Sequence, residues 1–338
     1  MTRRARLVTL LAGVVLLCSV AFASVLHAAG RAGERDRARS GGPSVAAGAV
    51  RLDAPGTMVF RNMAWGPHRD ELVSVAAGDP GGPRAAAPPR CLRFHAAAGV
   101  GVCLRKVDGA LGESYFASIL DARLRALRDY PLAGVPSRTR VAPSGHLAAW
   151  TVFAGGDSYA GGDFSTRTSI VDTRTGALTA SLEGYAIVKD GRRYHSADVN
   201  LWGVTFADDR RFYATLATKG RTYLVRGDIA ARTVTTVRAN VECPSLSPDG
   251  TRLVFKKRVA GLSPDEPWRL YALDLASMRE TPLAEGRSVD DQVVWADART
   301  VVYGLAGDFG ADLWSVPADG SGAPTRVAGA ALNPAYIG

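Results

Sequence analysis

Two segments, residues 154–167 and 189–202, combine residue types that could bind another molecule. Aromatic and arginine side chains dominate the energetics of many interfaces, and binding residues concentrate on loops that a rigid scaffold holds in place. A binding surface is therefore predicted from these side chains: Asp157, Tyr159, Asp163 and Phe164 in the first segment, and Arg192, Tyr194, Asn200 and Trp202 in the second. The alternative is a long connection whose Tyr194 and Trp202 pack against the neighbouring structure.

The sequence offers little for catalysis or metal binding. No pair among the five histidines has the spacing of a metal site, and no Gly-x-Ser-x-Gly nucleophile turn or phosphate-binding loop occurs. The carboxylate pairs Asp208–Asp209 and Asp290–Asp291 fall in or before predicted turns, where aspartate has an ordinary structural role. A Ca²⁺ site at Asp157 and Asp163 is an alternative, although their spacing is not that of an EF-hand. We predict no catalytic residue, no cofactor and no metal.

A turn signal recurs along the chain. In residues 246–255 a short apolar run leads into Ser-Pro-Asp-Gly, and a second alternating run follows. Proline presets φ in such a turn, aspartate bonds to nearby backbone N–H groups, and glycine accepts a positive φ. Similar signals are centred on positions 99, 145, 209, 250 and 298, which are separated by 46, 64, 41 and 48 residues. Three of these four distances match the length of one propeller blade.

Each hairpin signal is followed by a second strand–turn–strand pattern, which makes a unit of four strands with period-two alternation, repeated five times. Residues 329–338 are similar to the first strand of a unit, and residues 56–65 to the second. We therefore predict an all-β fold over residues 56–338, a six-bladed β-propeller of four-stranded antiparallel blades that N- and C-terminal strands close in one blade. Five or seven blades, or a β-sandwich, are the alternatives.

The first 28 residues carry a targeting pattern. Arg3, Arg4 and Arg6 precede an uncharged, mostly apolar run over residues 7–26, which predicts a signal peptide or an uncleaved signal anchor. Residues 29–55 are rich in Gly, Ala, Arg and Ser and predict a flexible linker. The net charge is +9, but much of it lies in the first 40 residues, so the remainder does not indicate nucleic-acid binding.

Three cysteines follow this region. Cys91 and Cys103 bracket a strand–turn–strand pattern with a turn near Ala97, and in an exported protein such neighbours tend to form a disulfide. The alternative is a pair of reduced core thiols. Cys243 is left over; we expect it to be buried and inert, with a reactive thiol as the alternative.

The repeats carry a resemblance. Ser-Pro-Asp-Gly at residues 247–250, followed by Leu-Tyr-Ala-Leu-Asp-Leu at residues 270–275, resembles TolB-type β-propeller repeats, and most of all the exported TolB-like proteins of actinobacterial type. The resemblance extends over roughly residues 56–338. It implies an exported propeller that binds other macromolecules, and it does not imply an enzyme.

The predicted function is that of an exported, non-catalytic binding or scaffold protein, secreted or anchored on the outer face of the cytoplasmic membrane. Its loops would bind a protein or a cell-envelope component; we expect a monomer whose membrane contact is limited to the N-terminal segment. The alternative is an enzyme that acts on an extracellular glycan or peptide through the central channel. That alternative requires charged groups at the channel, whereas the positions expected there, Val141, Thr205, Ser245 and Val293, are of mixed type.

Overall fold

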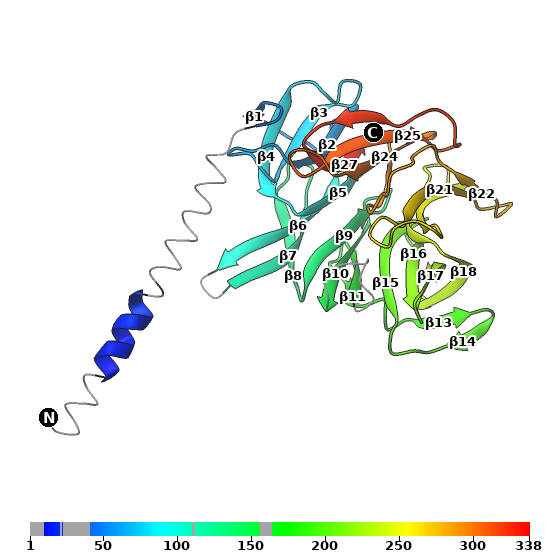
Figure 1. Ribbon diagram of the computed structural model, residues 1–338, viewed down its shortest axis with the longest axis horizontal. Coiled ribbons are helices and arrows are strands. Elements are labelled where there is room, and N and C mark those ends of the chain that lie inside the picture. Colours follow the sequence, from blue (N-terminus) through cyan, green and yellow to red (C-terminus); the bar gives the residue numbers. More distant parts are fainter. Residues whose placement is uncertain (1–9, 21, 23–40, 110–111, 156–163) are drawn as a thin grey trace.

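The computed structural model describes residues 10–20, 22, 41–109, 112–155 and 164–338. Six β-sheets surround a central axis and form a six-bladed β-propeller, as predicted (Figure 1). Residues 10–20 form a helix. Among the described residues, no helix combines the length and the apolar character that crossing a membrane requires.

Four blades consist of four antiparallel strands each, ordered in the sheet as they are in the chain. The second blade comprises β5 (Arg93–Ala97), β6 (Val100–Gly109), β7 (Gly112–Leu120) and β8 (Ala126–Leu132), and the third β9 (Val135–Val141), β10 (Leu147–Gly155), β11 (Ser165–Asp172) and β12 (Leu178–Thr179). The fifth comprises β19 (Glu242–Leu246), β20 (Arg252–Arg258), β21 (Trp268–Asp274) and β22 (Glu280–Pro282), and the sixth β23 (Val294–Trp295), β24 (Thr300–Leu305), β25 (Asp312–Pro317) and β26 (Thr325–Ala328).

The fourth blade is larger than the repeat predicts. Its four regular strands are β15 (Asn200–Phe206), β16 (Arg211–Thr218), β17 (Arg221–Asp228) and β18 (Thr233–Ala239). Two further strands, β13 (Ala186–Lys189) and β14 (Arg192–Tyr194), lie beyond β18, so the sheet has six strands.

Strands from both ends of the described propeller close the ring in the first blade. β27 (Ala331–Ile337) pairs antiparallel with β2 (Thr57–Asn62), and β3 (Glu71–Ala76) and β4 (Arg84–Arg90) follow outward. The register joins Thr57 to Ile337 and Asn62 to Ala331. This pairing satisfies backbone groups that an open ring would leave exposed, and it confirms the predicted closure.

The residues just before the propeller pack against it. β1 (Val45–Ala47) runs parallel to β4 at the outer edge of the first blade. Leu52 is buried, and its backbone N–H donates to the carbonyl of Ala122 at 2.9 Å. Residues 41–55 are therefore part of the folded body, in contrast to the expected linker over residues 29–55; residues 29–40 lie outside the described part of the chain.

A disulfide joins Cys91 and Cys103, whose Cα atoms are 5.3 Å apart. The turn that follows β5 lies at Ala98 and Gly99, which both have positive φ. Cys91 lies just before β5 and is not part of that strand. The residue of β5 that pairs with Cys103 in the sheet is Phe94. The disulfide therefore ties the connection between the first two blades to β6, and it indicates an oxidising, extracytoplasmic environment. Cys243 is a free and buried thiol.

Candidate functional site

The second predicted binding segment forms an extension of the fourth blade, which we define as residues 186–199. β13 and β14 are joined by a two-residue turn at Asp190 and Gly191, where both residues have positive φ. Asp-Gly is a preferred pair for such a turn, because few other residues adopt this backbone conformation without strain. β13 pairs parallel with β18, so β14 forms the outer edge of the sheet (Figure 1).

Side-chain hydrogen bonds hold the blade-four extension to the body. The Tyr194 hydroxyl lies 2.8 Å from the Thr218 hydroxyl. Asp198 accepts hydrogen bonds from the Thr218 hydroxyl at 2.8 Å and from the backbone N–H of Lys219 at 2.6 Å. Hydrogen bonds from Ser196, Lys219 and Thr218 lower the pKa of Asp198, so this carboxylate stays ionised and anchors the extension at neutral pH.

The described end of the first predicted segment contacts the end of the second segment. The ring of Phe164 packs edge-on against Trp202 with centroids 5.5 Å apart, and the Asn200 side-chain oxygen accepts from the Thr166 N–H at 2.7 Å. Trp202 is 1% exposed, so it packs in the interior, as the structural alternative expects. Arg192 is exposed and Tyr194 is half-buried. The predicted Asp157, Tyr159 and Asp163 lie outside the described residues.

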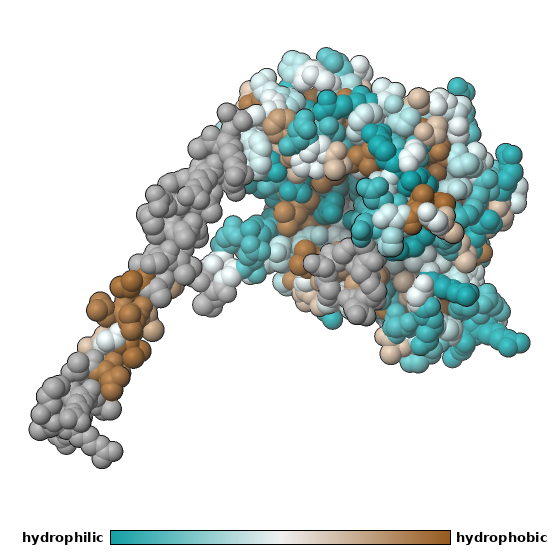
Figure 2. All heavy atoms as spheres, in the orientation of Figure 1, coloured by the Kyte–Doolittle hydropathy of each residue, from teal (hydrophilic) through white to brown (hydrophobic). Residues whose placement is uncertain are grey.

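A cavity of about 420 Å³ lies beside the blade-four extension. Its lining comprises Glu183, Gly184, Tyr185, Ala186, Ile187, Arg193, Tyr194, His195, Ser196 and Val199. Burial raises the pKa of Glu183, although hydrogen bonds from Ser181 and Thr168 oppose that shift. In the space-filling view the atoms over β13 and β14 are mostly hydrophilic (Figure 2). The sequence interpretation identified the segment that builds this cavity but not Tyr185, which precedes it.

The second irregular region lies at the axis, in residues 284–293 before β23. β23 has only two residues, and the residues that precede it do not pair in the sheet. The Arg138 guanidinium on β9 donates to the carbonyl of Asp290 at 3.0 Å. The Gln292 amide donates to the carbonyls of Gly203 in blade four and Pro244 in blade five. The axial segment, residues 284–293 ahead of β23, therefore bonds to blades three, four and five.

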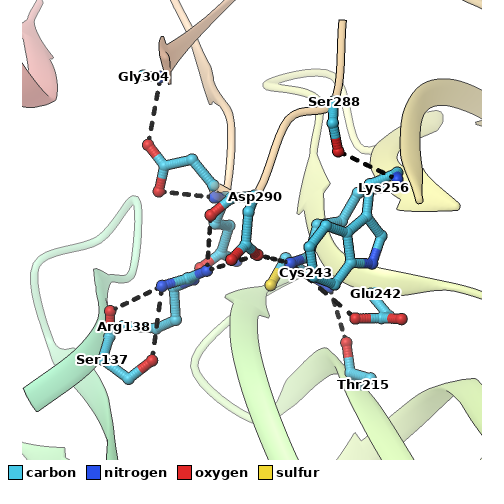
Figure 3. A network of polar contacts seen from close by, with 12 residues as sticks. Ser137, Arg138, Thr215, Glu242, Cys243, Lys256, Ser288, Asp290 and Gly304 are labelled. Carbon is cyan, nitrogen blue, oxygen red and sulfur yellow. Dashed lines mark hydrogen bonds and ion pairs between the residues drawn. The ribbon is translucent and has the colours of Figure 1, made fainter. Parts of the chain in front are cut away.

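Buried charges converge on this axial segment. Lys256 is fully buried and forms ion pairs with Asp290 and, at 4.0 Å, with Glu242. Figure 3 shows Asp290 between Arg138 and Lys256. Burial alone would raise the pKa of Asp290, but the charges of Lys256 and Arg138 lower it. Arg258 donates to Glu242 at 2.9 Å.

Val141, Thr205 and Ser245 line the channel and are uncharged, as expected, but the expectation missed the charged groups at the axial segment. It considered only the first strand of each blade, whereas Lys256 lies on the second strand of blade five, and Asp290 lies in a connection. The basic run at residues 256–258, at the end of a mostly buried strand, is the sequence signal that could have identified Lys256.

The remaining predicted aspartates divide between turn and bridging roles. Asp208 accepts from the backbone N–H groups of Arg210 and Arg211 at 2.8 and 2.7 Å, which is the expected turn chemistry. Asp209 instead contacts His146 of the neighbouring blade at 2.7 Å. In the ranges that the structure describes, no group of three or more His, Cys, Asp or Glu side chains is arranged to hold a metal ion.

Comparisons with known proteins give only distant structural matches. The chain matches no protein-family model and no curated protein. Similar solved structures include a puromycin-hydrolyzing peptidase of Mycobacterium tuberculosis, at 15% identity over 81% of this chain and 44% of that chain, with a TM-score of 0.48. The propeller domain of the trilobed protease from Pyrococcus furiosus aligns at 11% identity over 69% of this chain and 68% of that chain, with a TM-score of 0.40.

A structure of a nidogen–laminin complex aligns at 10% identity over 83% of this chain and 98% of that chain, with a TM-score of 0.50. The chain spans less than half of the Mycobacterium tuberculosis peptidase. Identities this low carry no information on activity. The strand topology makes the chain a six-bladed β-propeller, and the resemblance to TolB-type repeats stays a prediction.

Proposed function

We propose that this protein is an exported, non-catalytic binding protein that presents the blade-four extension to a protein partner of the cell envelope. The observation that carries the proposal is the pair of strands that β13 and β14 add to the outer edge of a four-stranded blade. These strands are not needed to close the ring, and they help to build a cavity whose lining includes Tyr185, Tyr194 and Arg193 together with one acidic residue, Glu183. A rigid propeller would present this surface with little ordering entropy lost on binding.

The charge of the extension favours an acidic partner. Its hairpin carries Lys189, Arg192 and Arg193 against a single acidic residue, Asp190. Lys189 is paired with Asp190 at 2.7 Å, whereas within the described part of the chain Arg192 and Arg193 form no ion pair. Two exposed guanidinium groups without internal carboxylates are suited to carboxylates of a bound segment.

The outer edge of β14 supports an extended segment as the bound form. In the described chain β14 pairs with β13 on one side only. An edge strand can add a strand from another protein, in which backbone hydrogen bonds provide affinity and side-chain pockets provide specificity. The cavity beside Tyr185 and Tyr194 could receive one side chain of such a segment.

The enzyme alternative, which acts on a glycan or peptide through the channel, has less support. The carboxylates nearest the axis are engaged with other residues: Asp290 with Lys256 and Arg138, and Glu242 with Arg258. The axial segment also bonds to blades four and five through Gln292. Such a network suits a structural tie between blades better than a group that must exchange protons with a substrate.

The test places a photo-crosslinking residue at Arg192 in intact cells. The same residue at Asp319, which is exposed on blade six, is the matched control. A single protein adduct from position 192, lost when Arg193→Glu is added and missing from position 319, supports the proposal. Equal adducts from both positions, or none from either, contradict it. Sequencing the N-terminus of the same purified sample would establish whether the N-terminal segment is cleaved.

A further inference from the structure

A cavity of about 290 Å³ lies in the channel at the end where the first and second strands of the blades are joined. The inner strands of all six blades contribute to its wall, which also reaches the turn residues Pro143, Ala207 and Pro248. Most of the lining is apolar and includes Ala97, Phe206, Leu246, Val294, Ala335 and Tyr336. Arg140 is the single charged residue among the lining residues in the described chain. The cavity therefore has apolar walls and one cationic end.

Arg140 is a buried cation without an ion pair in the described structure. It is 8% exposed, and one of its terminal nitrogens donates to the carbonyl of Val293 at 2.9 Å. Its Nε makes no hydrogen bond. Asp291 acts on it through its charge, but the Asp291 oxygens accept from the N–H groups of Gln292 and Gly304. A buried charge in this situation favours a counter-ion.

Burial lowers the pKa of Arg140 to about 10, and the charge of Asp291 opposes that shift. The guanidinium therefore stays protonated at neutral pH. Burial, together with the charge of Arg140, lowers the pKa of His95 well below its usual range, so the imidazole is neutral at neutral pH.

The contacts of His95 place a second donor beside Arg140. The backbone N–H of Val141 donates to His95 Nδ1 at 3.1 Å, so Nδ1 carries a lone pair and a neutral ring bears its proton on Nε2. The other terminal nitrogen of Arg140 lies 3.0 Å from that Nε2. A guanidinium can only donate, so two donors face each other. An oxygen that accepts from both would satisfy both.

We propose that Arg140 and His95 form a carboxylate-binding site in the wall of the channel cavity. A carboxylate has the required charge and enough lone pairs to accept from a guanidinium and an imidazole N–H together. The apolar walls suit an aliphatic chain behind the acid group. The volume lies at the lower limit of typical small-molecule sites of about 300–1,000 Å³, so the ligand is either a small aliphatic acid or the C-terminal residue of a peptide.

The experiment uses the full chain with ¹⁵N-labelled histidine at low salt. The His95 ring signals are assigned by their loss in His95→Asn, and the protein is titrated with isovalerate, with a tripeptide ending in valine, and with the amide of each. We expect a saturable shift of the His95 Nε2 signal with the acids. Arg140→Gln should weaken binding by about tenfold or more, since a charged hydrogen bond contributes about 1.5–3 kcal/mol. Sodium chloride at equal ionic strength is the control.

Two further variants test whether a loss of binding comes from the site itself or from a disturbed fold. Arg84→Gln removes another buried arginine, whose guanidinium donates to the carbonyls of Gly329 and Ala330, and it should bind the acids normally. Ala97→Leu fills part of the cavity without changing either donor, and it should also weaken binding.

The outcomes separate the two sources of the carboxylate. Tighter binding of the tripeptide than of isovalerate assigns the site to a peptide C-terminus, and equal or weaker binding assigns it to free acids. Amides that bind as well as the acids would overturn the proposal. So would a His95 signal that does not move, or binding that Ala97→Leu abolishes while Arg140→Gln leaves it unchanged. None of these readouts depends on a partner at the blade-four extension.

Discussion

Besides β1 at the outer edge of blade one, the described part of the chain departs from its four-strand repeat at the rim of blade four and at the axis, and these two departures differ in kind. At the rim, blade four gains β13 and β14, and its inner strands stay regular. At the axis, blade six keeps only two residues of its inner strand, and residues 284–293 cross toward the other blades. The extension at the rim adds exposed residues outside the ring. At the axis the inner strand of blade six is short, and buried charged side chains such as Lys256 lie beside it.

The difference shows where a propeller tolerates irregularity. Side chains at the rim, such as Arg192, face solvent, and the hydrogen bonds that hold the extension, such as that of Tyr194, connect it to blade four alone. At the axis, Lys256 is fully buried, and Arg138 of blade three reaches Asp290 of blade six. Changes at the axis should therefore destabilise the whole ring, and changes at the rim should alter binding with little effect on stability.

The largest effect is expected from Lys256→Met. The substitution takes the buried ammonium away from Glu242, which is 1% exposed, and from Asp290, which is 46% exposed. We expect a loss of about 2–3 kcal/mol, because Glu242 is left with one cationic partner fewer in the interior, whereas Asp290 stays solvated. Chemical denaturation would measure the free energy of unfolding. Lys257→Met is the matched control, because Lys257 is partly exposed in its ion pair with Glu280 and should lose less than about 1 kcal/mol. Equal losses in the two variants would contradict the distinction between axis and rim.

A pH dependence should come next. Because His95 is neutral in the folded state with a depressed pKa, the unfolded chain binds a proton below about pH 6.5 that the folded chain does not. Stability should therefore fall as the pH falls below 6.5, by up to about 1.4 kcal/mol per pH unit. Unfolding of the wild type and His95→Asn between pH 7.5 and 5.5 would measure this, and the variant should have the shallower slope. Parallel curves would show that His95 titrates normally.

A smaller loss is expected at the rim from Tyr194→Phe. This variant removes the hydroxyl that bonds to Thr218 and should reduce the free energy of unfolding by about 1 kcal/mol, as for a typical hydrogen bond. Thr218 retains its hydrogen bond to Asp198, which limits the loss. A loss as large as that of Lys256→Met would mean that the extension is part of the cooperative core.

The smallest change in stability is expected from Arg192→Ala. Its side chain is exposed, and surface substitutions usually change stability by less than about 0.5 kcal/mol. Partner crosslinking from a neighbouring exposed position, His195, should nevertheless fall. A variant that unfolds more readily but crosslinks normally would reverse the roles assigned to rim and axis.

Local patterns alone were enough to predict the strands of the repeat, the blade number, the closure of the ring and the disulfide, but not β1, β13 and β14. Alternating side chains and turn residues such as those at 247–250 act within a few positions, so they are readable without knowing the fold. The sequence also located the segment that becomes the blade-four extension, because it interrupts the repeat.

Only the tertiary structure decided what lies at the axis and which of the predicted side chains are accessible. Trp202 is buried because Phe164, from the other segment, packs on it. Arg138 and Asp290 are 152 positions apart in the chain, and they meet because ring closure brings blades three and six face to face. Arg140 and His95 lie 45 positions apart and meet because the inner strands of the neighbouring blades two and three pack against each other. No local pattern encodes such contacts, because they depend on how the blades pack around the axis.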